Sequence, residues 1–88
     1  MISGVIIRKI TKNEDPRGWL AEIYRADELD YRPLMSYVSV TKPGVIRGPH
    51  EHKWQSDAFV FIGPGNFELH LWDRRQNSPT SGEHLKLE

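Results

Sequence analysis

The chain has 88 residues and no cysteine, and its twelve Lys and Arg balance twelve Asp and Glu. A chain of this length buries only about 60% of the surface that its unfolded form exposes, so we expect one domain, residues 1–88, with a small core. The balanced charge disfavours nucleic acid and anionic membranes as partners, and the lack of cysteine excludes disulfides and thiolate zinc sites. The longest apolar run, residues 58–62, is too short to cross a bilayer, which predicts a cytoplasmic protein with no membrane partner.

The first half of the chain has the pattern of short strands joined by turns. Across the whole chain, six Pro and seven Gly occur too often for helices of ordinary length, and apolar residues alternate with a period of two between them. We expect strands over residues 1–10, 19–25 and 36–41, with a loop or a single helical turn over 26–34. Asp15-Pro16-Arg17-Gly18 has the residue preferences of a type I turn. The composition and this pattern predict an all-β fold.

The second half continues in the same way. Residues 58–62 have the length and the β-branched and aromatic content of a strand buried on both faces. Gly63-Pro64-Gly65-Asn66 would connect this strand to a return strand over residues 67–72, which forms a hairpin. A loop over 78–82 and a further strand over 84–88 complete the chain. The large apolar areas of Trp19, Trp54 and Trp72 favour places in the core.

Two histidines carry the clearest chemical signal. His50 and His52 are two residues apart, and on a strand this spacing directs both imidazoles to the same face. One use of that geometry is a metal site of His50 and His52, completed by a carboxylate such as Asp57 and by one or more residues from elsewhere in the chain. Another is acid–base catalysis near neutral pH, with Arg47 stabilising a developing oxyanion or binding a phosphate. The third is a solvated strand end with two unrelated histidines.

Three other residues leave alternatives open. Arg17 lies in a segment that is already a sufficient turn signal, so a purely structural role explains it. Glu22 shares a strand face with apolar residues, and its carboxylate lies either at a solvated edge or inside, held for a partner. His70 lies between two leucines, and this position favours a surface histidine over a ligand.

Several motifs, taken together in chain order, resemble known protein families. Gly44, His50-x-His52, Asp57 and Gly65 resemble the first motif of the cupin superfamily. The chain is more specifically similar to the dTDP-4-dehydrorhamnose 3,5-epimerases, from residue 2 to its last residues. The segments that carry this second resemblance are Asp15-x-Arg17-Gly18-x-Leu20-x-Glu22, Gly44-Val45-Ile46-Arg47-Gly48-x-His50, Trp72-Asp73-x-Arg75 and Ser78-Pro79-Thr80-x-Gly82.

The epimerase resemblance implies a fold, a reaction and roles for individual residues. It implies a cupin jelly-roll β-barrel, a homodimer and a dTDP-linked 4-keto-6-deoxyhexose as the substrate in deoxysugar (rhamnose) biosynthesis. His50 would be the base that removes a proton next to the C4 ketone. Arg17 and Arg47 would bind and polarise the substrate, and Glu22 would belong to the nucleotide-binding set. No metal and no cofactor is then required.

Some features of the chain favour other members of the superfamily. His52 is atypical of the epimerases, and Arg47-Gly48-x-His50-x-His52-Lys53 is similar to the sugar-nucleotide 3,4-ketoisomerases, in which both histidines are catalytic. The lysine that the epimerase pattern has near Asp57 is absent, which favours a non-catalytic cupin that binds a metal or a nucleotide sugar. Because the family places further pocket residues on a later part of the barrel, the chain is also expected to form only the N-terminal half, and an inactive half-barrel stays a third alternative.

Overall fold

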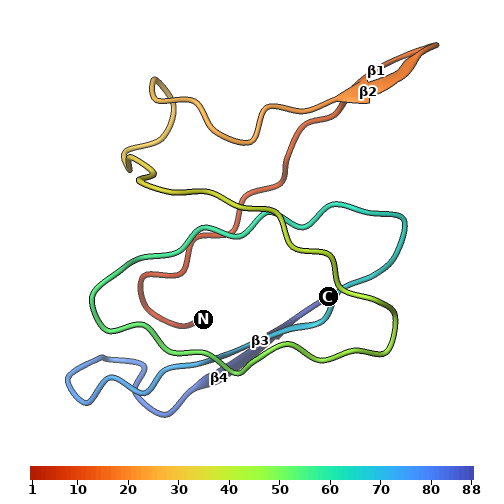
Figure 1. The fold of residues 1–88 in the computed structure, drawn as a ribbon. Coiled ribbons are helices and arrows are strands. Elements are labelled where there is room, and N and C mark those ends of the chain that lie inside the picture. The colour runs from red at the N-terminus through yellow and green to blue at the C-terminus, as the bar shows by residue number, and fades with distance from the viewer. The chain divides into compact units, whose positions relative to one another are not determined.

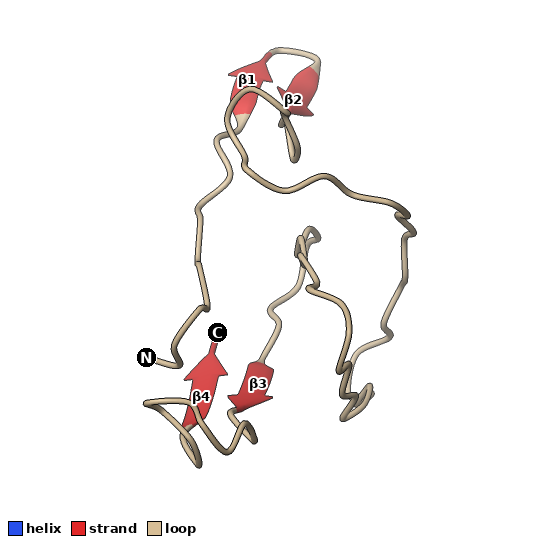
Figure 2. Ribbon diagram, turned by 90° about the vertical axis from the view of Figure 1, so that its left-hand side faces the viewer, coloured by secondary structure: helices blue, strands red, loops and turns tan.

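The computed structural model describes residues 1–88 as four short strands joined by turns and extended segments, with no helix (Figures 1 and 2). Strand β1 (Asn13–Asp15) pairs antiparallel with β2 (Gly18–Leu20), and β3 (Leu69–Trp72) pairs antiparallel with β4 (His84–Leu87). The all-β class is therefore confirmed, as a partial cupin-like β structure in which neither two-stranded sheet closes into a barrel.

Contacts along the chain divide it into two units. One unit consists of Ile10–Val60 and contains β1 and β2, and the other combines Met1–Lys9 with Phe61–Glu88 and contains β3 and β4. The prediction of a single domain stays a prediction. No helix in the structure has the length and apolar character needed to cross a membrane.

The first hairpin reverses where the sequence predicts a turn. In its two-residue connection, Oδ1 of Asp15 accepts a hydrogen bond of 2.8 Å from the backbone N–H of Arg17, which closes a local ring at the turn. Gly18 follows with a φ of +138°, a backbone conformation that a side chain would disfavour. Strand β2 ends at Leu20, so the predicted strand over 19–25 forms only in its first residues.

The segment after this hairpin forms the predicted single helical turn. The backbone N–H of Leu29 donates to the carbonyl of Arg25 at 3.1 Å, which is the spacing of one α-helical turn. The Tyr24 hydroxyl donates to the carbonyl of Tyr31 at 2.8 Å, and the two rings are in tilted contact with centroids 5.3 Å apart. These contacts join the two ends of the turn.

The second hairpin pairs different segments from those the sequence predicts. Strand β3 pairs with β4 in the register Leu69↔Leu87 to Trp72↔His84, and not with residues 58–62. The backbone extends this ladder by one step, because the N–H of Asp73 donates to the carbonyl of Glu83 at 2.9 Å. The predicted strands at 67–72 and 84–88 are therefore confirmed, whereas the predicted hairpin between 58–62 and 67–72 is wrong.

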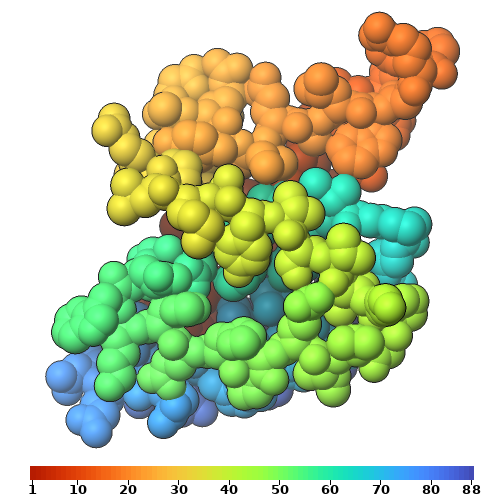
Figure 3. Space-filling model, in the orientation of Figure 1, coloured from red at the N-terminus to blue at the C-terminus, as the bar shows by residue number.

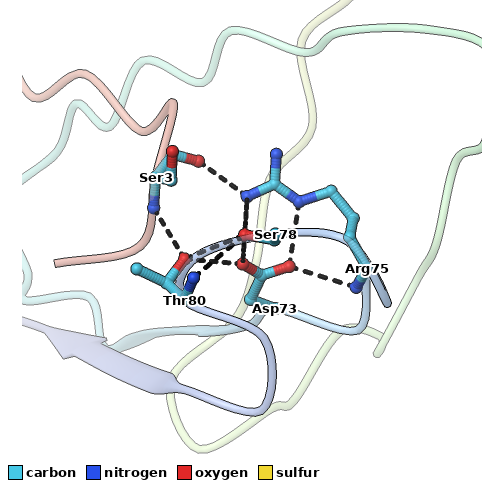
Figure 4. Close-up of polar contacts among 5 residues, drawn as sticks. All are labelled: Ser3, Asp73, Arg75, Ser78 and Thr80. Carbon is cyan, nitrogen blue, oxygen red and sulfur yellow. Dashed lines mark hydrogen bonds and ion pairs between the residues drawn. The ribbon is translucent and has the colours of Figure 1, made fainter.

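A buried carboxylate organises the loop between β3 and β4 (Figure 4). The side chain of Asp73 is fully buried, and its oxygens accept hydrogen bonds from Arg75 (2.9 Å and 3.0 Å), from the Ser78 hydroxyl (2.6 Å) and from the Thr80 hydroxyl (2.6 Å). The Arg75 guanidinium, followed by the two hydroxyls, holds the pKa of Asp73 far below its ordinary value. A buried charge is stable only when it is paired and hydrogen-bonded in this way.

The same loop fixes the beginning of the chain. The backbone N–H of Ser3 donates to Oγ1 of Thr80 at 2.9 Å, and Nη2 of Arg75 donates to the carbonyl of Ser3 at 2.8 Å (Figure 4). Ile2, next to this point, is 6% exposed. Side chains of the loop therefore hold Ser3 in this unit, without strand pairing.

Three predicted strands and the predicted tryptophan core do not form. Residues 1–10, 36–41 and 58–62 have no hydrogen-bonded partner strand, and residues of these segments such as Val38 stay largely exposed. In the space-filling view, side chains of the yellow and green part of the chain lie on the face toward the viewer (Figure 3). The tryptophans also differ from the prediction: Trp19 is 47% exposed, Trp54 96% and Trp72 54%. A period-two pattern identifies a segment that could be a strand, but a strand forms only when a partner accepts its backbone hydrogen bonds.

Candidate functional site

All the residues to which the sequence analysis gives a catalytic, substrate-binding or metal-binding role lie in the unit Ile10–Val60. Arg47, His50, His52 and Asp57 come from one extended stretch that has no regular secondary structure. Because backbone pairing does not hold this stretch, its local side-chain contacts decide where the functional groups lie.

Arg47 is anchored to the segment before it. Its Nε donates to Oγ1 of Thr41 at 2.7 Å, and its Nη2 donates to the carbonyl of Val40. These two bonds fix the plane of the guanidinium and leave its remaining N–H groups as donors. A fixed guanidinium with free donors is suited to binding a carboxylate, a phosphate or an enolate oxygen.

His50 follows a backbone turn that only glycine adopts easily. Gly48 has a φ of +95°, and a Cβ atom placed there would lie 3.3 Å from both the backbone N and the Cδ2 of His50. The absence of a side chain at Gly48 therefore gives the His50 imidazole its room. The His50 residue itself is exposed.

His52 is the one predicted site residue that contacts another. Its Nε2 lies 3.6 Å from Oδ2 of Asp57, and the other carboxylate oxygen accepts a hydrogen bond of 2.8 Å from Nε2 of Gln55. Gln55 thus orients the carboxylate that faces His52. Residues 51–55 line a shallow surface hollow of about 380 Å³ beside this group.

Arg17 and Glu22 contact residues of their own segments. Arg17 is 90% exposed and forms an ion pair with Asp15 at 2.6 Å, and its guanidinium lowers the pKa of Asp15. A carboxylate oxygen of Glu22 lies 3.3 Å from Nη1 of Arg25, and the side chain is 56% exposed. Of the two positions that the sequence allows for this carboxylate, solvated or held inside, the structure shows the solvated one. The structure shows no contact of either residue with the two histidines.

The sequence also offers His50, His52 and Asp57 as ligands of a metal ion. His52 and Asp57 approach each other, but no group of three or more His, Asp or Glu side chains is arranged to hold a metal ion. The catalytic assignment and the metal assignment of His50, His52 and Asp57 both stay predictions.

Two features were given no role by the sequence. Gln55 was missed, although its place two residues before Asp57 puts both side chains on one face of an extended segment. The second feature is the carboxylate network of the loop between β3 and β4, whose residues were recognised as motifs with no function attached. An Asp followed at short spacing by Arg, Ser and Thr is the signal that could have identified it.

The fold and the site define a class: cupin-like β proteins that carry histidines and a fixed arginine on one extended stretch. The chain belongs to the dTDP-4-dehydrorhamnose 3,5-epimerase family, whose family model matches residues 1–88. This confirms the resemblance found in the sequence, and the family is one of epimerases for sugar biosynthesis.

Two curated relatives are similar over nearly the whole chain. A protein of Haloferax volcanii named "Probable low-salt glycan biosynthesis epimerase Agl13" is 42% identical over 85 residues, which cover 93% of this chain and 54% of that protein. "Spore coat polysaccharide biosynthesis protein SpsL" of Bacillus subtilis is 40% identical over 85 residues, which cover 94% of this chain and 55% of that protein. The chain therefore spans about half the length of these relatives. No solved structure matches it.

Proposed function

We propose that the chain acts in a sugar-nucleotide epimerase that removes a proton next to the C4 ketone of a dTDP-4-keto-6-deoxyhexose. The observation that carries this proposal is the match of residues 1–88 to the epimerase family. The reaction needs a base that works near neutral pH and a group that stabilises the enolate oxygen. The chain supplies an imidazole for the first need and a guanidinium for the second.

In this proposal His50 is the base and Arg47 is the electrophilic group. The hydrogen bonds of Arg47 to Thr41 and Val40 support the role, because a fixed donor stabilises a developing charge without reorganising during the reaction. Arg17 would bind the substrate through its diphosphate, for which its present partner Asp15 would have to give way. Glu22 would contact the nucleotide.

A second candidate is a sugar-nucleotide 3,4-ketoisomerase, in which His52 is catalytic as well. The contact of His52 with Asp57 at 3.6 Å favours it, because a carboxylate beside an imidazole orients the ring. A cupin that only binds a metal or a nucleotide sugar would use the same residues without chemistry. A homodimeric, cytoplasmic enzyme acting on a nucleotide sugar completes the proposal.

The test is proton exchange in deuterated water. The protein is incubated with a dTDP-4-keto-6-deoxyhexose, and proton NMR follows the signals at C3 and C5. We expect these signals to disappear, and we expect His50→Ala to abolish the loss. Thr11→Val, a substitution at an exposed residue outside the candidate site, is the control, and it should exchange at the wild-type rate.

Each other outcome points to a different conclusion. Exchange at C3 together with migration of the ketone, and dependence on His52, would favour the ketoisomerase. Broadening of the nucleotide signals without exchange would leave a binding protein. Exchange that survives in His50→Ala would contradict the role of His50 as the base.

A further inference from the structure

A second pair of histidines lies on the sheet of β3 and β4, in the unit that does not contain the candidate site. In this sheet Trp72 pairs directly with His84, and His70 pairs with Lys86. Residues two apart on a strand share a face, so His70, Trp72 and His84 project from the same side. His70 and His84 are diagonal neighbours across the two strands.

The two imidazoles meet nitrogen to nitrogen. Nδ1 of His70 lies 2.8 Å from Nε2 of His84, the ring centroids are 5.0 Å apart, and the ring planes differ by 11°. This combination of distances means that the rings meet edge to edge in almost one plane. One of the two facing nitrogens donates and the other accepts, so a single proton lies between them.

A carboxylate determines which nitrogen of His70 carries its hydrogen. Oε1 of Glu68 lies 2.7 Å from Nε2 of His70, and an ionised carboxylate can only accept a hydrogen bond. The hydrogen is therefore on Nε2, so that in the neutral imidazole the lone pair is on Nδ1, which faces His84. A carboxylate behind a histidine in this manner is the usual outer partner of a metal-binding imidazole, because it fixes the ring and makes the ligating nitrogen more basic.

We propose that His70 and His84 together bind a divalent transition-metal ion of the kind that prefers imidazole, such as Zn²⁺, with Glu68 as the outer partner. Nδ1 of His70 and Nε2 of His84 are the ligand atoms, and the ion replaces the proton that they share. Solvent carries the displaced proton from Nε2 of His84 to Nδ1 of the same ring, so the imidazole stays neutral and the lone pair of Nε2 binds the ion.

The distances fit this exchange. A tetrahedral ion about 2.0–2.1 Å from each nitrogen requires the two nitrogens to be roughly 3.3 Å apart. They are now 2.8 Å apart, so an opening of about half an ångström is enough. Rotations about the side-chain bonds of two partly exposed histidines can supply it. The chain contributes two ligands, and water completes the coordination because His70 is 34% exposed.

Neighbouring groups support the site and offer a reporter. The ring of Trp72 is parallel to that of His84, with centroids 4.9 Å apart and planes 7° apart. Nζ of Lys86 lies 3.7 Å from Oε2 of Glu68 and so holds the carboxylate beside His70 without competing for the ligand nitrogens. A metal on His84 would lie beside the indole and change its fluorescence.

The experiment is a titration of the 88-residue chain with ZnCl₂, followed by NMR of the imidazole carbon-bound protons of all four histidines. We expect saturable shifts of His70 and His84 with one equivalent of zinc. Glu68→Gln should weaken the affinity about 10–100-fold, as loss of an outer carboxylate does. The variant with His50→Gln and His52→Gln together should keep the affinity of the wild type.

Two results would overturn the proposal. One is a set of zinc-dependent shifts confined to His50 and His52, with His70 and His84 unchanged. The other is an unchanged affinity in His84→Gln, whose β3–β4 pairing would be verified by the cross-strand proton contacts of the backbone. The wild-type spectra decide the first point directly, so the proposal can be refuted even if a variant loses its hairpin.

Discussion

The hydroxyl of Thr80 offers a direct test of the carboxylate network. Its Oγ1 donates to Oδ2 of Asp73 at 2.6 Å and accepts from the backbone N–H of Ser3 at 2.9 Å. Thr80→Val keeps the shape of the side chain and removes both bonds. A hydrogen bond to a charged group contributes about 1.5–3 kcal/mol, and a neutral one contributes about 0.5–1.5 kcal/mol. Water replaces part of what is lost when both bonds are removed. We therefore expect Thr80→Val to lower the free energy of unfolding by about 2–3 kcal/mol.

This loss is large for a chain of this size. A change of 1 kcal/mol shifts the melting temperature of such a domain by about 4–8 °C, so Thr80→Val should melt roughly 10–20 °C below the wild type. Thermal unfolding followed by circular dichroism at pH 7, with a urea titration beside it, measures the change. Thr11→Val makes the same substitution at an exposed position and should have little effect. If the two variants melt within about 2 °C of each other, the network does not stabilise the chain.

Two more predictions concern pH and the backbone beside His50. The pKa of Asp73 lies far below its ordinary value of 3.8, so the unfolded chain takes up the proton first as the pH falls. The free energy of unfolding measured by urea titration should therefore fall as the pH drops through this value. Asp73→Asn should show a smaller fall than the wild type, because Asp15, Asp27 and Glu68 also have lowered pKa values and contribute the rest. Gly48→Ala should cost about 1–3 kcal/mol in stability from its strained backbone and should also slow proton exchange, because the new Cβ would press on His50. Gly44→Ala is the control, since its φ is +77° and its Cβ would meet nothing within 4 Å; equal exchange rates in the two variants would contradict the steric argument.

The sequence predicted the local parts of the fold better than its pairing. The turn at residues 15–18, the single helical turn within 26–34 and the loop over 78–82 depend on residues a few positions apart, and all three form. The predicted partner of residues 67–72 was wrong because 58–62 and 84–88 both have a strand pattern. Periodicity cannot choose between two partners of similar pattern.

The candidate site shows the same division. Motifs along the chain were sufficient to identify the family, and they named Arg47 and His50. The contact that holds Arg47 was not predictable, because its bond to Thr41 depends on how the extended stretch bends. The contact between His70 and His84 was also not predictable, since the two residues are fourteen positions apart in the sequence.

By itself, the sequence determined the all-β class, the positions of the turns and the membership of an epimerase family. These three features depend on where Gly and Pro occur, on the alternation of apolar and polar residues and on short motifs, all of which are local properties of a chain. Only the tertiary structure decided which strands pair, and the buried Asp73 is the physical reason. Its charge must be satisfied by Arg75, Ser78 and Thr80, and the loop that gathers them brings β4 beside β3.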